Sequence, residues 1–331
     1  NGQLYIIESL QNGPEQIDYC LDLHSGANLI SFYALPEDAS IDNMMSSLTG
    51  NVTGVLGQGV AANYVEEFGW VGSLNTISPT SGYWVIVNES DSLCIEGAVP
   101  TEPDIEFNLQ AGANLVSFPS EGSIPIGDAL PDDIENFISG IIGQGIAASN
   151  HPAFGWSGSL SEFEGGKGYW MITYDDVSFS YDLSMLSRIR NAPLQKLNGY
   201  SYKQSTTQAF YFIEDIENIE VGDWILAYNG DNVIGARQWM GSIIDVPAMG
   251  NDGSDYTDGY IEVGVVPSFK ILRGDELINL EGDIPSWENN QLYMVSSLIE
   301  AIALPETFSL DRAYPNPFNP TTTFSFALPV T

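Results

Sequence analysis

The chain has 331 residues, of which 44% are hydrophobic, 11% aromatic and 16% charged, so it has ample material for two or three folded domains and is not of the disordered class. Its 44 acidic and 9 basic residues give a formal net charge of -35. Such a field repels nucleic-acid phosphates and anionic lipid head groups. Because no run of about 18 apolar residues occurs either, we expect no nucleic-acid partner and no membrane insertion.

The start of the chain lacks a basic segment followed by an apolar core, which fits an exported chain whose signal peptide has been removed. Its only cysteines, Cys20 and Cys94, are too few for a disulfide scaffold or a zinc site. They lie in the first and last strand-like segments of one repeat. We therefore expect neighbouring strands to bring them together as a disulfide, with two buried thiols as the alternative.

A duplication is the strongest signal in the sequence. Residues 19–96 align with residues 105–182 at a constant offset of 86, without a gap, and 25 of the 78 paired positions are identical. A repeated domain explains this pattern. The recurring pairs include Gly57/Gly143, Gln58/Gln144, Gly59/Gly145, Trp70/Trp156, Gly82/Gly168 and Trp84/Trp170.

Each repeat predicts a small mixed sheet covered by one helix. In the first copy the strands are expected at residues 27–32, at 54–62, near Trp70 and at 83–87. The helix is expected from apolar residues at spacings of three and four. These are Ile41, Met44, Met45 and Leu48 in the first copy, and Leu130, Ile134, Phe137 and Ile138 in the second.

After the repeats the composition changes, and short alternating strands separated by Gly and Asp turns predict a β-sandwich. The predicted fold class is mainly β with some α. It comprises two tandem small α+β modules, a β-sandwich domain and an extended C-terminal tail. We call these module 1 (residues 1–99), module 2 (100–185), the third domain (186–304) and the tail (305–331).

Three segments resemble those of known exported proteins. Gly-Ala-Asn-Leu-Ile/Val-Ser-Phe, at residues 26–32 and 112–118, resembles the "GWNLISIP"-type repeats of secreted bacterial surface proteins. The third domain, with Val221-Gly-Asp-Trp-Ile225, resembles a domain of exported marine bacterial proteins. Ala313-Tyr-Pro-Asn-Pro-Phe-Asn-Pro320 resembles the start of a type IX secretion sorting domain, which is related to a flagellar-hook-cap-like immunoglobulin fold. The resemblances imply an extracellular or cell-surface location and no defined activity.

A Gly-rich loop at residues 251–259 carries Asp252, Asp255 and Asp258. Flexible loops with oxygen ligands are what Ca²⁺ prefers, and so acidic a chain would gain from binding it. We therefore consider a structural Ca²⁺ as a cofactor. The spacing is not that of an EF-hand, and the alternative is a solvated turn in which the Asp side chains cap their own backbone.

Aromatic side chains point to a possible glycan partner, because flat rings stack on sugars. Trp70 and Trp156 are the predicted ligand-binding pair, since each is flanked by glycine on an expected turn and duplication would give two equivalent sites. Trp84 and Trp170 lie in apolar segments and are expected in the core. Trp239 is a further exposed candidate.

No catalytic motif accompanies these residues. The two Gly-Gln-Gly segments lack the Lys and Ser/Thr of a phosphate loop, so they predict close backbone packing. His24 and His151, the only histidines, fall at unmatched places in the two copies and have no motif of a catalytic triad. The chain is therefore expected not to be an enzyme.

The predicted function is an exported, non-catalytic surface protein that binds or adheres to a polymer or glycan. A first alternative is a structural subunit of an extracellular filament or sheath, made of copies of the same chain. Its assembly strands would be the terminal segments with Tyr5 and Ile7 and with Phe324 and Phe326, because lone strands can join a neighbour's sheet. A second alternative is an accessory module of a secreted enzyme.

Overall fold

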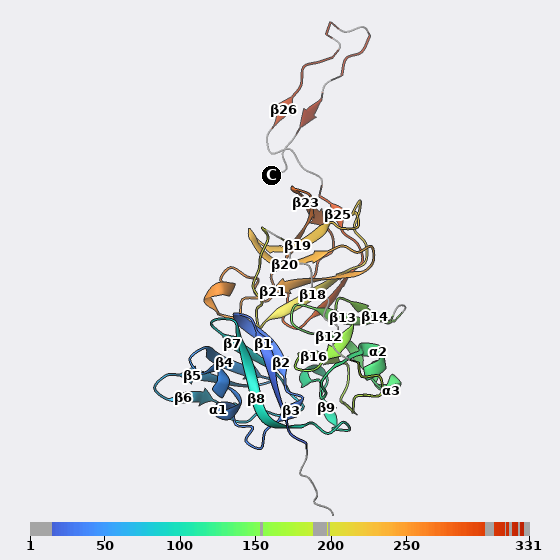
Figure 1. Ribbon diagram of the computed structural model, residues 1–331. Helices are drawn as coiled ribbons and strands as arrows, with labels where there is room; N and C mark the ends of the chain where they lie inside the picture. Colours follow the sequence, from blue (N-terminus) through green and yellow to red (C-terminus); the bar gives the residue numbers. More distant parts are fainter. Residues whose placement is uncertain are drawn as a thin grey trace, which may run out of the picture.

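The computed structural model describes residues 15–152, 155–187, 197, 199–301, 308–314, 316–317, 320–323 and 325–327. Strands dominate and the helices are short, so the predicted mainly β fold is confirmed. In Figure 1, module 1 (blue to teal) and module 2 (green) lie side by side beneath the third domain (yellow to orange). Within the described ranges, no helix is long and apolar enough to cross a membrane.

Module 1 is built on an antiparallel five-stranded sheet with the order β2-β7-β4-β5-β6 and a three-stranded sheet with the order β1-β8-β3. Because side chains alternate along a strand, Val55 and Ala62 face the core of the module, while Leu56 and Ala61 point to the opposite face. The strands are β1 (Ile17–Leu23), β2 (Gly26–Ser31), β3 (Ala34–Leu35), β4 (Val52–Gly57), β5 (Val60–Val65), β6 (Gly69–Gly72), β7 (Gly82–Val87) and β8 (Asp91–Pro100).

Module 2 repeats this arrangement. Its main sheet has the order β10-β16-β12-β13-β14, and β10, β16 and β14 begin and end 86 residues after β2, β7 and β6. Two small sheets, β11-β15 and β17-β9, complete it. The strands are β9 (Phe107–Leu109), β10 (Gly112–Ser117), β11 (Ser123–Pro125), β12 (Ile138–Ile142), β13 (Ala147–His151), β14 (Gly155–Gly158), β15 (Glu162–Glu164), β16 (Gly168–Thr173) and β17 (Val177–Phe179).

Three local predictions for the modules are wrong: two concern the sheets, and the third concerns the helices. The single strand expected at residues 54–62 is a hairpin of β4 and β5, because Gly59 adopts a φ of 71° and turns the chain. The main sheets are antiparallel rather than mixed.

The expected helices are reduced to short turns. In module 1, all four predicted apolar residues are buried, in α1 (Ile41–Met44), at Met45 and in the 3₁₀ turn η1 (Ser46–Leu48). In module 2, α2 (Ile126–Ala129) and α3 (Asp132–Glu135) are separated at Pro131, since proline removes a helical hydrogen bond. Phe137 is 40% exposed there, and Ile138 already belongs to β12.

The third domain pairs a five-stranded sheet, β20-β19-β22-β23-β25, with a three-stranded sheet, β21-β18-β24. Its core includes Tyr211, Phe269 and Trp287 and contains no residue of either module. A 3₁₀ turn, η2 (Asp255–Thr257), lies in the acidic loop. The strands are β18 (Gln208–Ile213), β19 (Trp224–Asn229), β20 (Asn232–Gln238), β21 (Ile244–Met249), β22 (Ser268–Arg273), β23 (Glu276–Glu281), β24 (Leu292–Val295) and β25 (Ile299–Glu300).

The two modules contact each other through matching residues. Gln58 accepts a hydrogen bond from the Leu115 amide at 2.8 Å, and Gln144 accepts one from the Leu29 amide at 2.7 Å. Since Gln144 and Leu115 lie 86 residues after Gln58 and Leu29, the contact repeats itself with the modules exchanged. This is the signature of an isologous interface around a local twofold axis.

Backbone contacts obey the same symmetry. A bridge joins Ile30 to Lys167, and its counterpart joins Val116 to Ser81. A Cβ atom at Gly82 would lie 2.8 Å from the Val116 carbonyl oxygen, and one at its counterpart Gly168 would lie 2.7 Å from the Ile30 carbonyl oxygen. Glycine is therefore required at both places for the modules to approach this closely.

Candidate binding cleft between module 2 and the third domain

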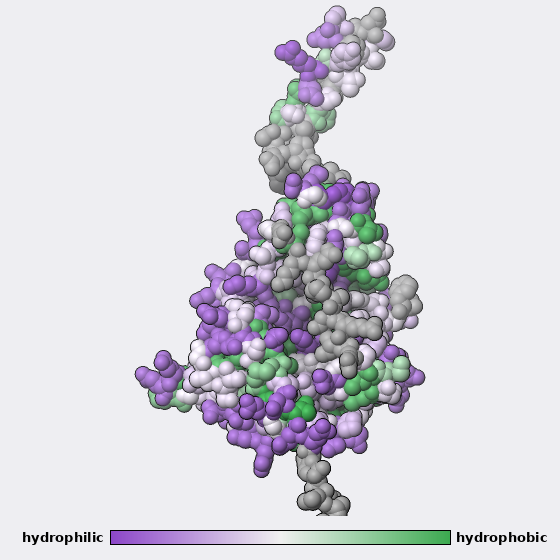
Figure 2. All heavy atoms as spheres, viewed as in Figure 1, coloured by the Kyte–Doolittle hydropathy of each residue, from purple (hydrophilic) through white to green (hydrophobic). Residues whose placement is uncertain are grey.

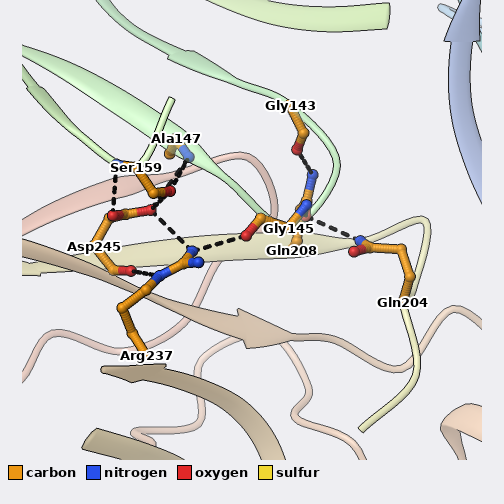
Figure 3. Close-up of polar contacts among 8 residues, drawn as sticks. All are labelled: Gly143, Gly145, Ala147, Ser159, Gln204, Gln208, Arg237 and Asp245. Atoms are coloured by element: carbon orange, nitrogen blue, oxygen red, sulfur yellow. Dashed lines mark hydrogen bonds and ion pairs between the residues drawn. The ribbon is translucent and has the colours of Figure 1, made fainter. Parts of the chain in front are cut away.

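A buried ion pair joins module 2 to the third domain (Figure 3). Arg237 on β20 and Asp245 on β21 lie 3.1 Å apart between Nη2 and Oδ2, and Asp245 is 1% exposed. The Asp245 carboxylate also accepts hydrogen bonds from the amides of Ala147 and Ser159 and from the Ser159 hydroxyl. Arg237 donates to the Gly145 carbonyl at 2.8 Å. The pair thus binds two segments of module 2.

Opposing effects act on the pKa of the Asp245 carboxyl. Burial raises its pKa above the ordinary value, because desolvation disfavours the charged form. The Arg237 guanidinium and the Ser159 hydrogen bonds oppose that rise. A buried carboxylate with this many partners is satisfied, so the network has the character of a structural clamp.

Two glutamines of the third domain hold the glycine turn of module 2. Gln208 donates to the Gly143 carbonyl at 2.8 Å and accepts from the Gly145 amide at 3.2 Å. Gln204 donates to the Gln208 side chain at 3.0 Å, which fixes its orientation (Figure 3). The second Gly-Gln-Gly segment is therefore bound on both sides: Gln144 contacts module 1, and its flanking glycines contact the third domain.

Apolar side chains complete this contact. Phe210 and Phe212 of β18 are fully buried against Ile142 and Ala147 of module 2. A Cβ atom at Gly158 would lie 3.0 Å from the Phe212 ring. The outer face of the module 2 sheet is thus covered by the third domain.

A cavity of about 900 Å³ opens beside the clamp. One wall comes from module 2 together with Leu29 of module 1, and the other comes from Trp224 of β19, from β20 and from the segment that leads into β21. Its volume is in the range of small-molecule binding sites. Its more accessible lining residues are Gln144, Ile146, Gly158, Ser159, Ser161, Glu162, Glu164, Lys167, Trp224, Gln238, Met240, Ser242 and Ile243.

The lining combines one flat aromatic surface with polar groups. Trp224 is half-buried, as are Glu162, Glu164 and Gln238, whereas Lys167 is exposed. Burial raises the pKa of the Glu164 carboxyl; Lys167 opposes this rise and the Glu162 charge adds to it. Trp224 also packs against the apolar cluster of Leu226, Tyr228, Ala236 and Leu272. A lining that combines an indole with amide, hydroxyl and carboxylate groups is compatible with a polyhydroxylated ligand such as a sugar chain.

The predicted pair Trp70 and Trp156 lies outside this cleft. Trp70 on β6 packs against the module 1 core and meets the Tyr64 ring edge-on at 5.5 Å. Trp156 on β14 packs against the module 2 core, and its indole donates to Glu135 at 2.8 Å. Both are half-buried and engaged in packing. Trp239, expected to be exposed, is buried with 7% exposure, so that expectation is wrong.

The predicted calcium residues are not brought together. Asp252 accepts hydrogen bonds from the amides of Thr206 and Ser254 and from the Thr257 hydroxyl, whereas Asp255 and Asp258 are exposed. Among the residues that the structure describes, no group of three His, Cys, Asp or Glu could hold a metal ion. The loop therefore fits the capped-turn alternative better than a Ca²⁺ site, which stays a prediction.

Cys20 and Cys94 lie opposite each other on β1 and β8 and form a disulfide. Of the proposed assembly strands, Tyr5, Ile7 and Phe324 lie outside the described residues. Phe326 belongs to β27 (Phe326–Ala327), which pairs with β26 (Ser309–Leu310) of the same chain. That strand therefore has a partner within its own tail.

Sequence reasoning missed the cleft and its clamp. Arg237, Asp245 and Gln208 come from strands that appear ordinary in the sequence, and Glu162 and Trp224 belong to different domains. One signal was available: Gln58 and Gln144 are polar residues preserved in both copies of a glycine turn. A conserved side chain between two glycines points to a specific contact as well as to tight packing.

In the comparisons with known proteins, no family, no curated protein and no solved structure matches the chain.

Proposed function

We propose that the chain is an exported, non-catalytic protein that binds or adheres to a polymer or glycan, and that the cleft between module 2 and the third domain is its binding site. The observation that carries this proposal is the lining of the cavity, to which Trp224, Gln238, Glu162 and Lys167 all contribute. Aromatic stacking would hold a sugar ring, and the amide and carboxylate oxygens would accept hydrogen bonds from its hydroxyl groups.

Several features support export. The disulfide between Cys20 and Cys94 suits an oxidising compartment. The tail motif at residues 313–320 resembles a secretion signal. A formal charge of -35 favours solubility outside the cell. On the face shown in Figure 2, hydrophilic residues dominate the lower end, which the two modules form.

A second candidate function is hydrolysis of the bound polymer. Glu162 and Glu164 are two residues apart on β15, so their side chains point to the same side of the strand. Both line the cavity, and burial raises the pKa of the Glu164 carboxyl. Pairs of carboxyl groups with different environments are the basis of glycoside hydrolysis.

One experiment separates these functions. The intact chain is screened for binding to immobilised neutral and acidic glycans, and each bound glycan is then incubated with the protein and analysed for shorter products. Binding without products supports the non-catalytic function. Products that disappear with Glu164→Gln would establish hydrolysis, and binding to no glycan would contradict both functions.

A further inference from the structure

The third domain touches both modules, but it fills only one of two symmetry-related places on them. Its main contact covers the outer sheet face of module 2 around Ile142, Ala147 and Ser159. A smaller contact reaches module 1, where a Cβ atom at Gly26 would lie 3.8 Å from the Tyr256 ring. The local twofold axis implies a second footprint: the outer face of module 1 together with Gly112 of module 2.

The residues of the main contact recur on module 1. Leu56, Ala61 and Ser73 stand where module 2 has Ile142, Ala147 and Ser159, and Gly57 and Gly59 match Gly143 and Gly145. Leu56 and Ala61 are half-buried, whereas their counterparts are fully buried. Ser73 is exposed, whereas Ser159 is half-buried. This face of module 1 keeps the composition of the covered face but remains accessible.

The smaller contact shows the same asymmetry. Gly26 is buried beside Tyr256, whereas Gly112 is exposed and a Cβ atom there would meet nothing within 4 Å among the described residues. Ala27 is fully buried, whereas its counterpart Ala113 is half-buried. Both parts of the second footprint are therefore open.

We propose that the outer sheet face of module 1, formed by Leu56, Gly59, Ala61 and Ser73, is a docking site for a β domain of the third-domain type carried by a partner chain. The described residues contain two such places and one domain of this type, and that domain occupies the place on module 2. The occupied face of module 2 shows how such a domain docks.

The chemistry of the partner follows from that template. It presents neighbouring aromatic side chains to Leu56 and Ala61, as Phe210 and Phe212 do to Ile142 and Ala147. It places an arginine at the Gly59 carbonyl, as Arg237 does at Gly145. Because no Lys or Arg precedes Lys167, module 1 carries neither residue that would repel a guanidinium on the partner.

The test uses residues 197–301 as a separate probe. All residues of the third-domain core lie within this range. Circular dichroism and a cooperative melt first establish that the probe is folded. The probe is then titrated into the intact chain by calorimetry. We expect one probe to bind per chain, and we expect Ala61→Arg in the intact chain to weaken binding by about tenfold or more, because the charge and bulk occupy the contact centre.

Two comparisons make the test decisive. Ser92→Arg adds the same charge to β8, on another sheet of module 1, and should leave binding unchanged. Residues 15–187 without the third domain expose both footprints and should bind two probes. If this tandem binds one probe and the intact chain binds none, the module 1 face is not a docking site and the proposal is overturned. Equal binding by Ala61→Arg and the unaltered chain would also overturn it.

Discussion

At the scale of residues, the charged groups that matter most are the few removed from water. Asp245 and Arg237 have 1% and 9% exposure, and each partner of the pair binds backbone groups of module 2. Each charge compensates the other, because a buried charge without its partner lowers the stability of the fold. Composition predicts that such a chain is acidic at its surface, but it cannot indicate which carboxylate folding will bury.

The clamp yields the first prediction. Asp245→Ala leaves the Arg237 guanidinium buried without its counter-charge, so we expect the free energy of unfolding to fall by about 3–5 kcal/mol. Urea denaturation followed by tryptophan fluorescence measures the change. The double substitution Arg237→Met with Asp245→Leu removes both charges and should cost less than the single one, although the amides of Ala147 and Ser159 also lose their acceptor in it. A single substitution that costs no more than the double one would contradict the clamp.

The acidic loop yields a prediction about pH. Burial alone would raise the pKa of Asp252, but the hydrogen bonds from Thr206, Ser254 and Thr257 outweigh it and hold the pKa below its ordinary value. A lowered folded-state pKa contributes stability above the unfolded pKa of about 3.9 that is lost as pH falls through the folded value. Asp252→Asn should therefore flatten the dependence of stability on pH below about 4.

Thermal melts between neutral and acidic pH check this. Asp255→Asn is the matched control, because it removes an exposed carboxylate from the same loop. If Asp252→Asn and Asp255→Asn give parallel curves, the hydrogen bonds to Asp252 do not stabilise the loop as described.

At the scale of elements, the sequence predicts three of the repeated strands well, because the gapless offset of 86 preserves the bounds of β2, β7 and β6 in β10, β16 and β14. It predicts turns and helices less well. Gly59 looks like any glycine until its positive φ divides one expected strand into two. The spacing of Leu130, Ile134 and Phe137 looks helical, yet Pro131 and the start of β12 at Ile138 leave no room for a long helix.

The paired glutamine turns yield a prediction about symmetry. Gln58→Ala and Gln144→Ala each leave a buried amide, that of Leu115 or Leu29, without its acceptor. Each substitution should lower the free energy of unfolding by about 1–3 kcal/mol. Because the two contacts are related by the local twofold axis, the two costs should be similar.

Chemical denaturation of both variants measures these costs. Gln110→Ala, at an exposed position of module 2, is the control and should change little. A cost for one glutamine and none for the other would show that the two modules do not share an isologous contact.

At the scale of the whole molecule, three cores are joined by specific polar contacts and by two smaller apolar clusters. Each of the three cores is made of residues from one part only, so the proposed binding cleft depends on how the parts are held together. Sequence reasoning identified the parts from repetition and composition. The cleft could not be found that way, because Trp224 and Glu162 line one cavity only when the third domain docks on module 2.

The disulfide yields a prediction about the stability of module 1. Its cysteines are separated by 74 residues, so it closes a long loop and constrains the unfolded chain. Replacing both Cys20 and Cys94 by Ala should cost about 2–5 kcal/mol. The loss should appear in the transition of module 1, and an unchanged melting profile in reducing and oxidising buffer would contradict this.

The central claim is that the cleft between module 2 and the third domain binds a polymer or glycan. Calorimetric titration of the intact chain with the glycan that binds best in the screen tests it most directly. We predict that Trp224→Ala and Gln238→Ala each weaken binding by about tenfold or more, while Tyr174→Ala, an aromatic residue with 69% exposure outside the cleft, binds like the unaltered protein. Full affinity in both cleft variants would place the binding site elsewhere and contradict the account.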